Sequence, residues 1–128
     1  MRLLLDTHLL LWASIEPERL SRETRRLIDD REHMLLFSAI SIWEVAIKQS
    51  RRRPGFDSDP GLLRRSLREN GFAELMLTSI HAAAVLDLPP IHKDPFDRIL
   101  IAQATVEDIT LLTSDAIMAR YPGPVKRV

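Results

Sequence analysis

The feature that most constrains the fold is the alternation of short apolar runs with segments of helical periodicity along the chain. Strands are predicted at residues 2–6, 34–37, 73–77 and 109–113, with a short edge strand at 125–128. Helices are predicted between them, at about 7–13, 21–30, 38 or 41 to 50, 62–70 and 78–86, with a long helix after Pro95 and a short one up to Tyr121. Strands that alternate with helices favour an α/β fold, in which a parallel sheet is covered on both faces and joined by right-handed crossovers.

The size of the chain predicts one domain over residues 1–128, with the Pro/Gly turns near residues 54–61 as a loop rather than a boundary. The absence of cysteine excludes disulfides, Cys-ligated metals and a Cys nucleophile. No uninterrupted apolar run exceeds five residues, as in Leu9 to Ala13, whereas a membrane span needs about 20. Asp6 and His8 interrupt the apolar N-terminus before a signal peptide could form. We therefore expect a cytoplasmic protein with no membrane partner.

The net charge is zero, with 18 basic and 18 acidic residues, so the whole chain gives no argument for a polyanionic partner. The charge is nevertheless uneven between residues 48 and 68. That segment has two acids and seven basic residues, namely Lys48, Arg51, Arg52, Arg53, Arg64, Arg65 and Arg68. Such a face is either a solvated helix surface or a local nucleic-acid contact.

Four acidic residues fall where the predicted sheet would gather them. Asp6 ends the first strand and Asp115 follows the fourth, while Glu44 and Asp97 lie in the first turns of helices. Sites in open α/β sheets form beyond the carboxyl ends of the strands, and the helix of Glu44 should start at that edge. The helix of Asp97 follows another helix, so its start is less firmly placed.

Each acid also has a purely structural interpretation. Ser41 and Glu44 have the spacing of a capping box, as do Asp94 and Asp97, and Asp115 is a plausible helix N-cap. Acids near helix N-termini also gain about 0.3–1 kcal/mol from the helix dipole.

Asp6 is the hardest acid to explain in that way, because it follows a buried leucine run. Four converging carboxylates would repel one another unless a cation lay between them, and a hard divalent metal suits oxygen ligands. The four histidines are scattered, which speaks against zinc. An oxygen-only metal site supports hydrolysis of phosphoesters, and no Gly-rich phosphate loop points to a nucleotide cofactor.

Four segments together resemble the VapC-type PIN-domain ribonuclease toxins of type II toxin–antitoxin systems. They are Leu5–Trp12 (LDTHLLLW), Ser41–Lys48 (SIWEVAIK), His92–Ala104 (HKDPFDRILIAQA) and Leu111–Asp115 (LLTSD). They occur in the family's order and cover essentially the whole chain.

The resemblance implies a three-layer α/β/α PIN-like fold with a central, mainly parallel sheet of four to five strands. It implies an endoribonuclease that depends on Mg²⁺ or Mn²⁺ and acts as the toxin of a toxin–antitoxin pair. The implied partners are an RNA substrate, a cognate antitoxin that blocks the site, and a second copy of the chain in a homodimer.

The resemblance also assigns catalytic and metal-binding roles to Asp6, Glu44, Asp97 and Asp115, of which the fourth acid is the most variable position in the family. Thr113 matches a hydroxyl position near the acids.

Other residues near these acids have two interpretations each. His8 either orients a neighbour or contacts substrate, and Arg98 either contacts phosphate or pairs with an acid. Lys48 lies four residues after Glu44, so it either pairs with that acid or faces RNA. The arginine run 51–53 is the best candidate for contacts to the RNA backbone.

The remaining polar and aromatic positions are interpreted as structural. Asp94 is predicted to cap a helix, His81 to pack, and His92 to be a structural or solvated loop residue. Trp12 and Trp43 are interpreted as core residues rather than a platform for bases.

Two alternatives remain open. A catalytically silent PIN-like module would bind RNA or protein and use the acids only as caps. A phosphatase of the haloacid dehalogenase type would require a second aspartate two residues after Asp6, where this chain has His8.

Overall fold

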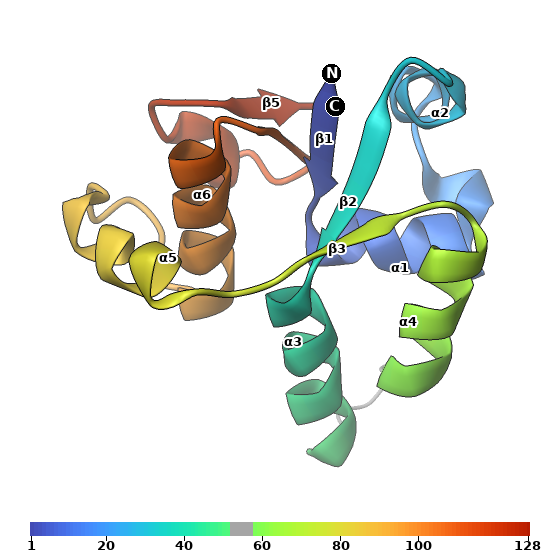
Figure 1. The fold of residues 1–128 in the computed structure, drawn as a ribbon, viewed down its shortest axis with the longest axis horizontal. Coiled ribbons are helices and arrows are strands. Elements are labelled where there is room, and N and C mark those ends of the chain that lie inside the picture. Colours follow the sequence, from blue (N-terminus) through green and yellow to red (C-terminus); the bar gives the residue numbers. More distant parts are fainter. Residues whose placement is uncertain (52–57) are drawn as a thin grey trace.

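The structure is a computed structural model that describes residues 1–51 and 58–128, and it confirms the α/β class (Figure 1). The strands are β1 (Arg2–Leu5), β2 (Met34–Ser38), β3 (Ala73–Leu75), β4 (Thr110–Thr113) and β5 (Val125–Arg127). They form one sheet in the order β3-β2-β1-β4-β5, and every neighbouring pair is parallel. The predicted edge strand at the end of the chain is therefore confirmed as β5.

The helices are α1 (Thr7–Ile15), α2 (Arg22–Asp29), α3 (Ala39–Ser50), α4 (Pro60–Glu69), α5 (Ser79–Ala84) and α6 (Pro95–Glu107). Three 3₁₀ turns accompany them: η1 (Pro17–Arg19), η2 (Val85–Asp87) and η3 (Met118–Arg120). The short helix predicted up to Tyr121 is thus only the single turn η3. Over the described ranges, no helix has both the length and the apolar character that crossing a bilayer requires.

The sheet buries both of its faces, because side chains alternate along each strand. In β1, Leu3 and Leu5 point into one apolar cluster and Leu4 points into the other. In β4, Leu112 joins the first cluster and Leu111 the second. Continuous apolar runs such as these are typical of parallel strands covered on both sides.

Helices cover the two faces, which gives the predicted three layers. Leu9 and Leu10 of α1 and Leu63 and Leu67 of α4 pack in the first cluster. The apolar face of α6, including Leu100, packs in the second. Figure 1 shows α5 and α6 on one side of the sheet and α1, α2 and α4 on the other.

Two helix starts decide how the acidic residues should be interpreted. Ser38, the last residue of β2, caps α3 by accepting a hydrogen bond from the Ile40 N–H, so Ser41 lies inside the helix. Of the two predicted starts of this helix, the one at Ser38 is confirmed, and the capping box of Ser41 and Glu44 is wrong. Asp94 caps α6 ahead of Pro95, as predicted.

Candidate functional site

The four acids converge at the carboxyl edge of the sheet. Asp6 directly follows β1, Asp115 lies two residues beyond β4, and Glu44 lies in α3, which leaves the end of β2. The start of α6, which the sequence placed least firmly, brings Asp97 to the same place. Glu44, Asp6 and Asp115 all act electrostatically on its carboxyl group.

Asp6 is almost completely buried and both of its carboxylate oxygens have partners. Its Oδ1 accepts a hydrogen bond from the Leu9 N–H at 2.9 Å, which caps α1. Its Oδ2 accepts from the Thr113 hydroxyl at 2.6 Å. Burial nevertheless raises the pKa of Asp6, and the two hydrogen bonds only partly offset this effect.

Glu44 is buried between a hydroxyl and an ammonium group. Thr7 donates to its Oε1 at 2.7 Å and also lies 2.9 Å from the Ser41 hydroxyl. Lys48 donates to its Oε2 at 2.6 Å, which confirms the predicted pair one helical turn apart. Thr7 was not among the predicted site residues; its place directly after Asp6 was the available indication in the sequence.

Asp97 is largely buried and surrounded by other carboxylates. Burial and the neighbouring carboxylates of Asp94, Glu44, Asp6 and Asp115 raise the pKa of Asp97 from 3.8 to about 8. Negative charges so close to the Asp97 carboxyl group disfavour its ionised form. A cation bound among them would reverse that preference.

His92 lies close to Asp97 and Asp115, a position that was not predicted from the sequence. Its Nε2 is 3.0 Å from Asp97 Oδ2 and 3.6 Å from Asp115 Oδ2. The other oxygen of Asp115 accepts from the Ile117 N–H at 2.7 Å, so this acid also caps a turn, as predicted. The only sequence indication for His92 was its place in the HKDPFD segment, five residues before Asp97.

The donor set fits a divalent cation. His92, Asp97 and Asp115 each offer a ligand atom within 4.8 Å of the others. The buried carboxylate of Asp6 and the raised pKa of Asp97 mark a place with an excess of negative charge. Carboxylate oxygens in such a cluster suit Mg²⁺ or Mn²⁺ better than they suit zinc.

Arg98 follows Asp97, and the hydrogen bonds of its guanidinium go to groups other than the acids. Nη1 donates to the Pro89 carbonyl at 3.0 Å and to the Tyr121 hydroxyl at 3.1 Å. Nη2 donates to the Val85 carbonyl at 3.2 Å. No acid pair appears among these contacts. Arg98 instead joins the segment before α6 to Tyr121, directly after η3.

The other predicted contact residues have varied positions. His8 is exposed, tilts against Trp12 with ring centroids 6.2 Å apart, and acts on the charge of Asp6. Arg51 is exposed at the end of α3, while Arg52 and Arg53 lie outside the described residues. Trp43 is 54% exposed, so its interpretation as a core residue is wrong.

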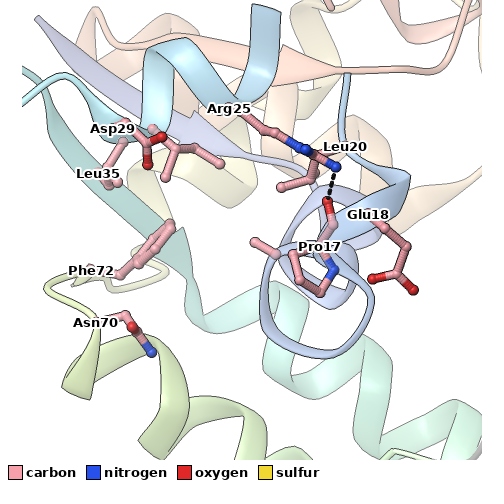
Figure 2. Close-up of a pocket in the computed structure, with 10 residues that line it drawn as sticks. Pro17, Glu18, Leu20, Arg25, Asp29, Leu35, Asn70 and Phe72 are labelled. Atoms are coloured by element: carbon pink, nitrogen blue, oxygen red, sulfur yellow. Dashed lines mark hydrogen bonds between the residues drawn. The ribbon is translucent and has the colours of Figure 1, made fainter. Parts of the chain in front are cut away.

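A large pocket lies elsewhere in the fold. It measures about 720 Å³ and is lined by residues of α1, η1, α2, β2 and the turn before β3. Figure 2 shows Leu35 and Phe72 in its wall and the hydrogen bond from Arg25 to the Pro17 carbonyl. The four acids are not among its lining residues.

Comparison with known proteins identifies the family. The family model of the PIN domain matches residues 3–124, almost the whole chain. The chain belongs to the PIN-domain family. This PIN domain is 30% identical over 124 residues to a protein named Ribonuclease VapC22 from Mycobacterium tuberculosis, with 95% of each chain covered. The family match also removes the haloacid dehalogenase alternative.

A solved structure supports the fold of this PIN domain. The crystal structure of VapBC2 from Rickettsia felis, bound to a DNA fragment from their promoter, contains a similar chain with a TM-score of 0.71. The similarity covers 99% of this chain and 98% of that one, at 14% sequence identity. At that identity the likeness concerns the fold, which is the predicted PIN-like one.

Proposed function

We propose that this PIN domain is a VapC-type toxin, an endoribonuclease that hydrolyses RNA phosphodiester bonds with the help of Mg²⁺ or Mn²⁺. The observation that carries the proposal is the convergence of Asp6, Glu44, Asp97 and Asp115 from four different elements at one edge of the sheet. The name of the M. tuberculosis relative, Ribonuclease VapC22, supports the same activity.

The four acids would hold the cation. A bound divalent ion supplies Lewis-acid activation of water and neutralises charge on the phosphate. The pKa of Asp97, at about 8, leaves much of this carboxyl group protonated at neutral pH in the absence of a cation. Its ionisation is therefore coupled to cation binding.

The protein orients two of these acids before any ligand arrives. The Thr113 hydroxyl and the Leu9 N–H fix both oxygens of Asp6. Thr7 and Lys48 fix both oxygens of Glu44. A site whose carboxylates are already held by buried partners loses little conformational freedom on binding, which favours precise placement of the scissile phosphate.

The remaining parts of the proposal concern partners and location. We propose a cognate antitoxin as the protein partner, a homodimer as the assembly and the cytoplasm as the location. The similarity of this chain to one in the R. felis VapBC2 structure supports the antitoxin as a partner.

The experiment is incubation of the purified, antitoxin-free protein with total RNA in Mn²⁺, in Mg²⁺ and in EDTA, followed by sequencing of the new 5′ ends. The proposal predicts discrete fragments in the metal samples and intact RNA in EDTA. Fragments that persist unchanged in EDTA would contradict the metal dependence.

The silent module remains a second candidate, because Lys48 and His92 already place positive or proton-bearing groups against the acids. Thermal unfolding with increasing Mn²⁺ separates the two. A nuclease of the proposed kind is stabilised by the cation, whereas a module without a metal site is not.

A further inference from the structure

His92 is placed at the acid cluster but has no role in the function proposed above. Its Nε2 faces both Asp97 and Asp115, at 3.0 Å and 3.6 Å from their Oδ2 atoms. The ring is largely buried, with a side chain 17% exposed. A histidine in such a position is either a nitrogen ligand for the cation or a group that acts through the carboxylates.

The hydrogen bond at the other ring nitrogen distinguishes these two roles. The backbone N–H of Asp94 donates to His92 Nδ1 at 3.2 Å. A nitrogen that accepts a hydrogen bond carries no proton, so the ring proton lies on Nε2, the atom that faces the two carboxylates. Histidines that bind a metal show the opposite arrangement, since they donate their second N–H to a carbonyl or carboxylate.

We propose that His92 is a positioning residue and not a metal ligand: the Asp94 N–H keeps the proton on Nε2, and the protonated Nε2 orients the Asp97 carboxylate, 3.0 Å away, beside Asp115. The cation of the proposed function, on which this part rests, would then be bound by carboxylates. Of His92, Asp97 and Asp115, whose possible ligand atoms lie within 4.8 Å of one another, only the two acids would then bind the cation.

The segment that carries His92 is fastened on both sides. The His92 N–H donates to the Tyr121 hydroxyl at 2.6 Å, and that hydroxyl also accepts from Arg98 at 3.1 Å. Arg98 in turn holds the Pro89 and Val85 carbonyls. These contacts fix the approach of the imidazole to the acids, and they give the guanidinium of Arg98 a structural role in this segment.

Two other histidines provide internal references. His81 repeats the arrangement away from the site: its Nδ1 accepts from the Thr78 N–H at 3.1 Å and its Nε2 lies 3.2 Å from Glu107 Oε1. His33 has the reverse arrangement, because its Nδ1 lies 2.9 Å from the Leu27 carbonyl, which can only accept. The fold thus predicts the same tautomer for His92 and His81 and the other tautomer for His33.

The first test is ¹⁵N NMR of the ring nitrogens in the metal-free protein, which identifies the protonated nitrogen of each neutral histidine. His92→Gln and His81→Gln variants assign the signals. We expect protonated Nε2 in His92 and His81 and protonated Nδ1 in His33. A His92 ring protonated on Nδ1 would overturn the proposal, whether or not the protein cuts RNA.

The second test asks whether the imidazole touches the cation. Electron spin-echo spectroscopy of the Mn²⁺-loaded protein detects a directly bound ¹⁴N nucleus. The proposal predicts no histidine coupling, and such a coupling from His92 would overturn it. If Mn²⁺ does not bind at all, the metal-dependent function fails, while the NMR result still decides the tautomer.

The third test compares variants by Mn²⁺ titration and by RNA cleavage. His92→Leu removes the proton donor and should weaken Mn²⁺ binding or activity by about 10–100-fold, as loss of groups that orient ligands does. His92→Gln retains an N–H near the position of Nε2 and should recover most of that loss, whereas His81→Gln should leave Mn²⁺ binding unchanged. Equal losses in His92→Leu and His92→Gln, with both proteins folded, would contradict a donor role.

Discussion

The hydroxyl of Thr113 donates a 2.6 Å hydrogen bond to Asp6 Oδ2, joining the ends of two neighbouring strands that are 107 residues apart in sequence. Both residues are buried, at 0% and 2% exposure. The same hydroxyl oxygen accepts from the Asp115 N–H at 3.0 Å. The Thr113 side chain therefore links Asp6 and Asp115, which follow the neighbouring strands β1 and β4.

Replacement of this hydroxyl should destabilise the protein and disturb the site together. Thr113→Val keeps the shape but leaves a buried carboxylate oxygen without its donor, which costs about 1–3 kcal/mol. We expect that loss in urea unfolding, with weaker Mn²⁺ binding in a parallel titration. Thr113→Ser retains the hydroxyl and should keep most of the Mn²⁺ affinity; Mn²⁺ binding by Thr113→Val as tight as that of the wild type would show that the bond does not orient Asp6.

The raised pKa of Asp97 makes the stability of the metal-free protein depend on pH. In the unfolded chain the group titrates near 3.8, and in the folded protein near 8, so between these values the folded state binds more protons. The free energy of unfolding should therefore fall as pH rises from about 4 to about 8, by at most about 1.4 kcal/mol per pH unit from this group.

The matched measurement is urea unfolding of the wild type and Asp97→Asn in EDTA across that pH range. The variant lacks the titrating group, so its stability should decline less steeply. Asp6, whose pKa is also raised and whose charge acts on Asp97, is still present in the variant, so a shallower curve and not a flat one is expected. Parallel curves would mean that Asp97 titrates normally in the folded protein.

Lys48 should contribute more to stability than an ordinary surface cation. Its partner Glu44 is buried, with a side chain 3% exposed, and the two groups lie 2.6 Å apart. Lys48→Met should therefore cost about 2 kcal/mol, because a buried carboxylate loses its charged donor. The control is Arg64→Met, which breaks the exposed pair with Glu74 and should cost less than about 1 kcal/mol. Equal losses in urea unfolding would contradict the difference in burial.

Arg51 remains a predicted contact to the RNA backbone. If it neutralises one phosphate of single-stranded RNA, Arg51→Ala should reduce the slope of log affinity against log salt by about 0.7. Binding is measured in an Asp6→Asn background so that the RNA stays intact. Arg31→Ala, at an exposed position between α2 and β2, is the charge-matched control. Identical slopes for both arginine variants would remove Arg51 from the interface.

Much of the fold could be predicted because strands and helix starts are encoded by residues close together in the sequence. Apolar runs and caps place the five strands and the start of α6 within a few residues, as Asp94 and Pro95 illustrate. The error at Ser41 arose because Ser38, at the end of a strand, is an equally good cap, and the sequence alone does not choose between them.

The site was predictable in its acids but not in the groups that surround them. Contacts such as Thr113 to Asp6, or His92 to Asp97, join residues whose proximity depends on strand order and on the path of the segment before α6. The partners of Arg98 could not be predicted for the same reason, since Val85 and Tyr121 belong to other segments. Tertiary packing, which periodicity does not encode, decides these contacts.

RNA cleavage by Asp6→Asn beside the wild type, in Mn²⁺ and in EDTA, tests whether the four acids form the catalytic site of a nuclease. Asparagine still caps α1, so the variant should fold and melt cooperatively. Loss of a charged ligand worth several kcal/mol should lower the cleavage rate at least about 100-fold. Asp108→Asn, the same change at the exposed end of α6, should cut like the wild type. RNA cleavage at the wild-type rate by folded Asp6→Asn would contradict the assignment of Asp6 to the catalytic site.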